Sequence, residues 1–335
     1  MQVHLAGSIP LDDTGAVFDL SGPALGAACS RYPDGETGAR KNWIGWQFRA
    51  FAGQDALEQG KERERDYQLH PPFRFKPGKG PDDLAFPPLG FADAALQSFA
   101  VFEQKQAMGV LPAAAKFLVA FPTPFAPVYS FTSYDVQEQV YPVYEAAILG
   151  ELGTICSTVP HARLAVQWDV ATEMSIFENV YPVPFDNAWE ILTRRLAALG
   201  ERVPSGVELG YHLCYGSMNN RHWKEPDDLS MCVDTANDLV RQVGRTIDFL
   251  HMPVPINRTD DAYFAPLRNL AVSKDTELFL GLVHDGDGLA GNRARIATAK
   301  KHVRDFGIGS ECGWGRHNAD KAVEIMQLHA QLAAL

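Results

Sequence analysis

The sequence predicts an α/β fold: a single (β/α)8 barrel over residues 1–335, with a long insertion after its second strand. Three observations predict it. The chain has 335 residues, 46% of them apolar, which is enough to bury a large core. Short apolar runs alternate with segments of helical period, and eight such units occur, the number that a closed TIM barrel requires.

Eight segments have the pattern of strands, because each is a short apolar or alternating run that ends in a polar or glycine-rich turn. They cover residues 2–8, 28–34, 115–122, 163–170, 206–214, 246–252, 276–284 and 307–312. Segments of helical period cover 135–152, 184–200, 228–244, 290–305 and 319–334. Because strands and helices alternate, the pattern favours a parallel sheet.

The connection from about 37 to 114 is much longer than the others. It contains the charged run KERER at 61–65, which we expect to form a solvated helix face, a proline-rich stretch at 70–83 and an apolar helix near 92–108. Connections of this length are usually functional lids or carry structure of their own. The sequence leaves open whether the insertion is a lid or a partner surface.

The composition excludes several classes of partner. The 41 acidic residues outnumber the 30 basic ones, and the net charge of −11 would repel nucleic acid. There is no apolar run of about 18 residues and no secretory signal pattern at the start, so we expect a cytoplasmic protein without membrane contact. The five cysteines are irregularly spaced, which favours reduced thiols. Small-molecule partners are expected, and the oligomeric state is left open, a homodimer included.

Alternation along the strands indicates which side chains meet inside the barrel. In 206–214 the apolar residues share one face, so His212 and Cys214 point inward at the carboxyl end, where barrel enzymes carry their active sites. An imidazole and a thiol at i and i+2 lie only about 7 Å apart along a strand. The pair could bind one zinc ion, or be a core histidine beside a buried cysteine.

The same alternation directs three more polar residues to this rim. Asp169 ends the inward face of 163–170, and Ser8 ends that of 2–8, although a serine there could instead cap a turn. A buried carboxylate such as Asp169 must be paired or functional. Cys312 follows the last strand in a glycine-rich segment and offers a second thiolate.

Five short motifs occur in a characteristic order: AGSIP at 6–10, PDGETGARKNWIGW at 33–46, QWDVATE at 167–173, GYHLCYGS at 210–217 and SECGWGR at 310–316. Together they resemble the cobalamin-independent methionine synthase family, specifically its catalytic zinc barrel. The resemblance extends over nearly the whole chain, but the matching residues are concentrated in these five motifs. It implies a zinc-dependent methyltransferase that acts on a thiol such as homocysteine, with the choice between a tetrahydrofolate and another methyl donor left open.

The resemblance also implies roles for particular residues. Zinc would be bound by His212, Cys214 and Cys312, and Ser8, Glu36 and Asp169 would hold the amino acid portion of homocysteine. Asp169 is thereby also a catalytic candidate.

The chain departs from the family in two respects. The family has a glutamate at the end of the sixth strand where this chain has His251, so the zinc site would use two histidines and two cysteines, or three ligands and an open position. By alternation His251 shares a face with Ile247 and Phe249, so we expect that a bulge is needed for it to reach the ion. The synthase also has two fused barrels, so its methyl donor is not implied for this chain.

Aromatic residues crowd the expected mouth of the barrel and could stack on a flat donor, either a folate pterin or a methoxylated aromatic ring. They are Trp43, Trp46, Phe121, Phe125, Tyr215 and Trp314. His284 and His317 lie just beyond strand ends and are candidates for proton transfer.

Other functions stay open. A metal-independent enzyme of the uroporphyrinogen decarboxylase type would need inward arginines, for which Arg31, Arg40 and Arg316 are available. A demethylase acting on an aromatic methoxy compound would use the same thiol chemistry. The glycine-rich stretch 284–292 is a candidate for phosphate binding, although it lacks a lysine and a full glycine fingerprint. A catalytically inactive barrel that binds a ligand or stores zinc is the non-enzymatic alternative.

Overall fold

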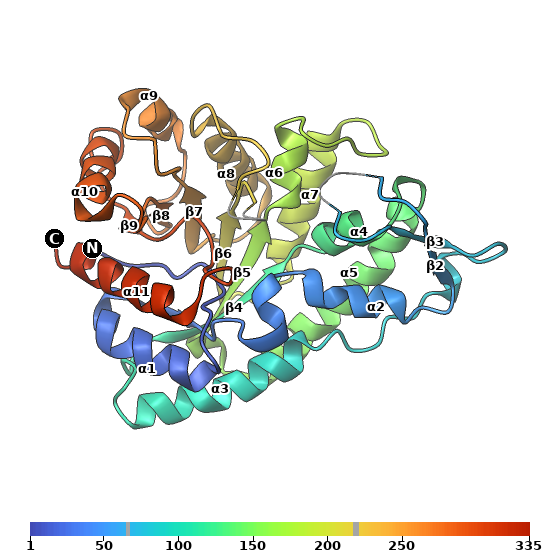
Figure 1. Ribbon diagram of the computed structural model, residues 1–335, viewed down its shortest axis with the longest axis horizontal. Coiled ribbons are helices and arrows are strands. Elements are labelled where there is room, and N and C mark those ends of the chain that lie inside the picture. The colour runs from blue at the N-terminus through green and yellow to red at the C-terminus, as the bar shows by residue number, and fades with distance from the viewer. Residues whose placement is uncertain (65–67, 217–220) are drawn as a thin grey trace.

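The computed structural model describes residues 1–64, 68–216 and 221–335. Its centre is a curled sheet of seven parallel strands, in the order β1-β4-β5-β6-β7-β8-β9, which forms a half-barrel (Figure 1). The strands are β1 (Arg31–Pro33), β4 (Lys116–Pro122), β5 (Leu164–Val170), β6 (Glu208–Leu213), β7 (Phe249–Pro253), β8 (Glu277–Gly281) and β9 (Gly307–Ile308). Seven of the eight predicted strand segments therefore form the predicted parallel sheet.

The segment expected as the first strand, 2–8, lies between the two edges of this sheet without being a regular strand. Val3 forms an isolated parallel bridge with Ile308 of β9, and its N–H donates to the carbonyl of Ala28, 2.7 Å away. The N–H of Ile9 donates to the carbonyl of Gly35, just after β1. Because β9 is only two residues long, it offers too few partners for a longer ladder.

Helices cover the outer face of the sheet. Six predicted helices are confirmed: α3 (Phe91–Ala107), α5 (Gln137–Thr158), α7 (Ala188–Glu201), α8 (Ser230–Gln242), α10 (Gly288–Ala299) and α11 (Ala319–Ala333). The sequence pattern missed α1 (Thr14–Leu25), which begins where the Asp13 side chain accepts a hydrogen bond from Ala16 N and contains Pro23. It also missed the short α2 (Phe48–Ala52), α4 (Phe125–Phe131), α6 (Thr172–Phe177) and α9 (Asp261–Phe264). None of the helices within the described ranges is both long and apolar enough to cross a bilayer.

The insertion carries structure of its own. After α2 come β2 (Leu57–Gln59) and β3 (Phe73–Phe75), an antiparallel pair that lies well away from the main sheet (Figure 1). The charged run was expected on a helix, and this is wrong for residues 61–64, which form bends and coil. Arg65 and the Ser217 that ends the GYHLCYGS motif lie outside the described residues.

A small apolar cluster fills the inside of the curled sheet below the candidate site. Leu118, Ala165, Phe249 and Phe279 come from four different strands and are at most 1% exposed. Phe249 therefore faces the interior, and so does His251, two residues later on the same strand. The expectation that His251 needs a bulge to reach the interior is wrong, because the face it shares with Phe249 is the inner one.

Candidate metal centre

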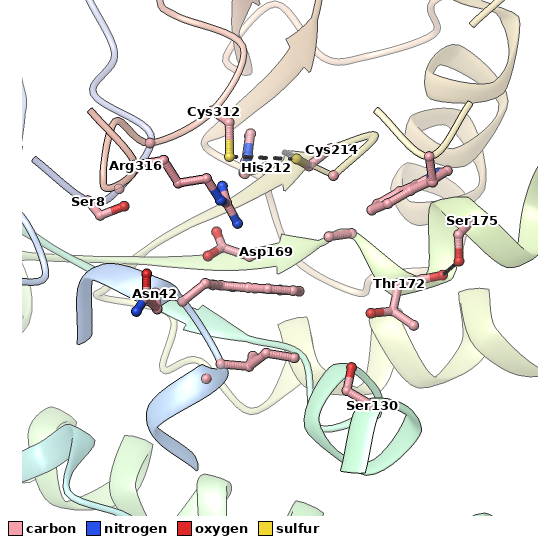
Figure 2. Close-up of a pocket in the computed structure, with 18 of the residues that line it drawn as sticks. Ser8, Asn42, Ser130, Asp169, Thr172, Ser175, His212, Cys214, Cys312 and Arg316 are labelled. Atoms are coloured by element: carbon pink, nitrogen blue, oxygen red, sulfur yellow. Dashed lines mark hydrogen bonds between the residues drawn. The ribbon is translucent and has the colours of Figure 1, made fainter. Parts of the chain in front are cut away.

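The structure brings the three predicted ligands together. His212 lies near the end of β6, Cys214 follows it, and Cys312 comes four residues after β9. A ring nitrogen of His212 and the two sulfur atoms all lie within 4.8 Å of one another, and the sulfur atoms are 3.7 Å apart (Figure 2). Imidazole nitrogen and thiolate sulfur are the ligands that zinc prefers.

His251 contacts His212 instead of joining this group. The two histidines are paired in register on β6 and β7, and their Nδ1 atoms are 2.7 Å apart. Nε2 of His212, which has no hydrogen-bond partner in the described part of the chain, is thus the nitrogen left for an ion. Nε2 of His251 lies against Gly281 and Gly309, where an added Cβ would come within 3.0 and 3.1 Å of it.

The charges at this site depend on one another. Burial lowers the pKa of His212, but the adjacent Cys312 and the charge of Asp169 outweigh burial, so the pKa is raised overall. The pKa of His251 is lowered well below its usual value by burial and by the charge of His212. Hydrogen bonding to Cys312 and burial raise the pKa of Cys214 well above that of a free thiol. Two adjacent thiolates therefore need a cation between them, which fits a zinc site.

Two carboxylates face the same cavity as the thiols. Asp169, at the end of β5, is only 6% exposed, and burial raises its pKa to about 7 even though the charge of His212 opposes the shift. The pKa of Glu36 is raised well above its usual value by burial and then by the charges of Asp169 and Asp34. A ligand with an ammonium group would relieve this repulsion between like charges.

The predicted serine lies beside this pair. Ser8 is 8% exposed and lines the cavity, and an added Cβ at Gly313 would come within 2.7 Å of its Oγ. Any larger residue at Gly313 would therefore displace Ser8.

The segment that carries Glu36 is conformationally unusual. Glu36 and Trp43 have φ angles of 47° and 52°, and both residues line the cavity. A positive φ is costly for a residue with a side chain and is found preferentially at functional sites. Hydrogen bonding from Trp43 also acts to lower the pKa of Asp169.

The cavity has a volume of about 1240 Å³, including its mouth. Figure 2 shows Ser130, Thr172 and Ser175 together on the side away from Ser8. Aromatic side chains also line the cavity: Trp43, Tyr129, Phe131, Tyr181 and Trp223. Among these aromatic residues, sequence reasoning found only Trp43. Tyr129 and Phe131, like Ser130, Thr172 and Ser175, lie on α4 and α6, which are too short for a readable helical period.

Several predicted aromatic residues lie elsewhere. Phe121 is absent from the cavity lining, because it is fully buried on the helix-facing side of β4 against Trp168 and Phe91. Phe125 and Trp46 do not line the cavity either, and Trp46 packs on Phe91.

A second cavity, of about 850 Å³, is also lined by the two thiols. Cys214, Gly216, Cys312 and Gly313 line both cavities. Tyr215, Trp314, His284 and His317 line only the second one, so the structure separates Tyr215 and Trp314 from the predicted acceptor residues.

The arginines required by a decarboxylase do not converge. Arg31 starts β1 and pairs with Glu208 and Glu277, while Arg40 pairs with Asp34. Of the three candidates, Arg316 alone lines the first cavity within the described part of the protein.

The glycine-rich stretch 284–292 does not present a cationic site. Arg295 forms an ion pair with Asp287 at the start of α10, and Asp285 pairs with Lys321. Two carboxylates at this helix start oppose phosphate binding.

Comparisons with solved structures show the same fold. A B12-independent methionine synthase from Shewanella sp. W3-18-1, in complex with selenomethionine, aligns with a TM-score of 0.60 and 13% identity over 99% of this chain and 95% of the other. A protein from Listeria monocytogenes, provisionally described as a vitamin-B12-independent methionine synthase, gives a TM-score of 0.52 and 15% identity over 95% and 86%. No family model matches the chain, and no curated protein matches it.

Proposed function

We propose that this protein is a zinc-dependent methyltransferase that moves a methyl group to the thiol of a small amino acid, homocysteine or a close relative. The observation that carries the proposal is that His212, Cys214 and Cys312 lie within 4.8 Å of one another in the wall of the cavity that Asp169 and Glu36 also line. The histidine and the two cysteines suit a metal ion that binds the acceptor sulfur. The two carboxylates suit the ammonium group of the acceptor.

Each residue has a defined task in this proposal. Nε2 of His212 and the two sulfur atoms would hold the zinc ion, which when bound keeps an acceptor thiol deprotonated near neutral pH. Asp169 and Glu36 bind the ammonium group, and Ser8 hydrogen-bonds the carboxylate. The Shewanella structure supports this acceptor, since its ligand is an amino acid with a methylated selenium in the place of sulfur.

The methyl donor would occupy the aromatic part of the first cavity. The rings of Tyr129, Phe131 and Trp223 can stack on a flat molecule, and Thr172 and Ser175 supply hydroxyl groups. A carbon–sulfur bond forms as the bond from the methyl group to the donor nitrogen or oxygen breaks, and the acceptor proton ends on that atom. A folate and a methoxylated aromatic compound both satisfy this balance, and the second would make the protein a demethylase.

We further propose that residues 1–335 form one domain and that the extended segment beginning at 2–8 closes the half-barrel at the position of an eighth strand. The bonds of this segment to Ala28, Gly35 and Ile308 support closure, since they reach both edges of the sheet.

The experiment is a methyl-transfer assay on zinc-loaded protein with homocysteine and either 5-methyltetrahydrofolate or 2-methoxyphenol, with methionine measured by mass spectrometry. We expect methionine from the wild type, loss of it in Cys214→Ser, and retention in Cys156→Ser, whose thiol lies on α5. Equal turnover by Cys214→Ser, or no methionine with either donor, would contradict the proposal.

A further inference from the structure

A chain of three buried polar side chains runs through the interior beneath the candidate site. His4 is 1% exposed, Gln167 is 0% and Asp169 is 6%. Nε2 of His4 lies 2.7 Å from Oε1 of Gln167, and Nε2 of Gln167 lies 2.8 Å from both Asp169 Oδ1 and the carbonyl oxygen of Ala6. The proposed function uses only the last of the three side chains.

The hydrogen bonds fix the orientation of the Gln167 amide. A carbonyl oxygen can only accept, so the atom that faces Ala6 must be the amide nitrogen. Oε1 then faces His4, whose Nε2 must carry a hydrogen. Because burial holds the pKa of His4 at about 3, its ring is neutral and Nδ1 is bare. Both N–H groups and the oxygen of Gln167 are thus engaged.

This arrangement leaves Asp169 little freedom to rotate. One N–H of Gln167 is directed at Asp169 Oδ1, and the other is held by the fixed backbone of Ala6. Rotation of the carboxylate would leave a buried N–H without a partner, which is costly. Gln167 and Asp169 also share the inner face of β5, so the strand sets their spacing.

We propose that Gln167, itself held by His4, is a positioning residue that fixes the Asp169 carboxylate for the ammonium group of the acceptor. The inference rests on the proposed function for the identity of the acceptor. A charged group contributes much less to ligand binding when it is displaced by even about 1 Å from its optimal position. The hydrogen-bonded series His4–Gln167–Asp169 therefore governs discrimination between acceptors that have an amino group and acceptors that lack one.

The test compares two ligands on zinc-loaded protein by isothermal titration calorimetry: homocysteine and 4-mercaptobutyrate, which is the same thiol acid without the amino group. The variants are Gln167→Leu, His4→Phe, whose ring suits the neighbouring Phe249 and Phe279, and the exposed control Gln139→Leu. We expect Gln167→Leu to weaken homocysteine binding about 10- to 100-fold and 4-mercaptobutyrate binding by less than about twofold. His4→Phe should give a smaller loss with the same selectivity, and Gln139→Leu none.

The outcomes separate the two proposals. Equal weakening of both ligands, or unchanged homocysteine binding, overturns the positioning role. A wild type that binds neither ligand contradicts the proposed function instead. A crystal structure of Gln167→Leu then tests positioning by itself: a displaced or disordered Asp169 carboxylate supports it, and an unmoved one overturns it.

Discussion

The Nδ1 atoms of His212 and His251 share a hydrogen bond of 2.7 Å across two neighbouring strands. If Nε2 of His212 holds a metal ion, Nδ1 of His212 carries the hydrogen and donates it to Nδ1 of His251, and this bond sets the plane of the His212 ring. In the proposed zinc site, His251 would therefore orient the ligand His212 and would not itself bind the ion.

Replacing His251 by glutamine should weaken zinc binding but leave its stoichiometry intact. Removing a group that orients a metal ligand typically costs about 10- to 100-fold in affinity. Competition with a chromophoric chelator measures the affinity, and the exposed His161→Gln is the control. Complete loss of zinc at saturation would show that His251 is itself a ligand, and an unchanged affinity would show that it does not orient His212.

Replacing Cys312 by serine should remove most of the bound metal. Elemental analysis of the purified wild type should give about one zinc per chain, because one imidazole and two thiolates form a site with an open fourth position. The variant should fall well below this value, whereas Cys156→Ser should not. A wild type without stoichiometric zinc would end the metal hypothesis.

The stability of the protein should fall between about pH 4.5 and 7 because of Glu173. Burial raises the pKa of Glu173 to about 7, against a hydrogen bond from Thr123 that lowers it. The folded state holds a proton that the unfolded state releases, so this stabilisation is complete below pH 4.5 and is lost as the pH rises through 7.

Urea unfolding at pH 5, 6, 7 and 8 measures this effect in Glu173→Gln. We expect the variant to gain up to about 3 kcal/mol over the wild type at pH 8 and little at pH 5, since each unit of pKa shift corresponds to about 1.4 kcal/mol. The exposed Glu103→Gln is the control and should not change how the free energy of unfolding depends on pH. If the free energies of unfolding of Glu173→Gln and the wild type differed by the same amount at all four pH values, the assignment to Glu173 would be contradicted.

Adding a methyl group at Gly210 should destabilise the fold. A Cβ there would lie 2.1 Å from the ring of Phe249, its partner in register on β7. Overpacking of this kind costs about 1–3 kcal/mol or more. Urea unfolding should show the loss, with part of it recovered in Gly210→Ala/Phe249→Leu.

Gly150 is the matched control, because an added Cβ on α5 meets nothing within 4 Å. Gly150→Ala should stabilise by about 0.5–1 kcal/mol, since alanine is the better helix former. Equal effects at the two glycines would contradict the packing argument.

Local pattern was enough to predict most of the sheet and the inward direction of His212, Cys214 and Asp169, because alternation along a strand is a backbone property. The segment 2–8 did not form the expected strand, since a ladder depends on the length of its partner β9. Phe121 was placed wrongly at the mouth, because it lies on the helix-facing side of β4 beside Trp168, its neighbour in register. The short helices and the second cavity arise from tertiary packing, which no local pattern records.

Within the first cavity, Ser8 lies on one side and Thr172 and Ser175 lie on the other (Figure 2), and the sulfur atoms of Cys214 and Cys312 line the same cavity. The proposed acceptor and the proposed donor therefore have separate places within one cavity, so the arrival of one need not await the departure of the other. Such a layout favours sequential kinetics through a ternary complex over a ping-pong cycle, and intersecting double-reciprocal lines would be its signature.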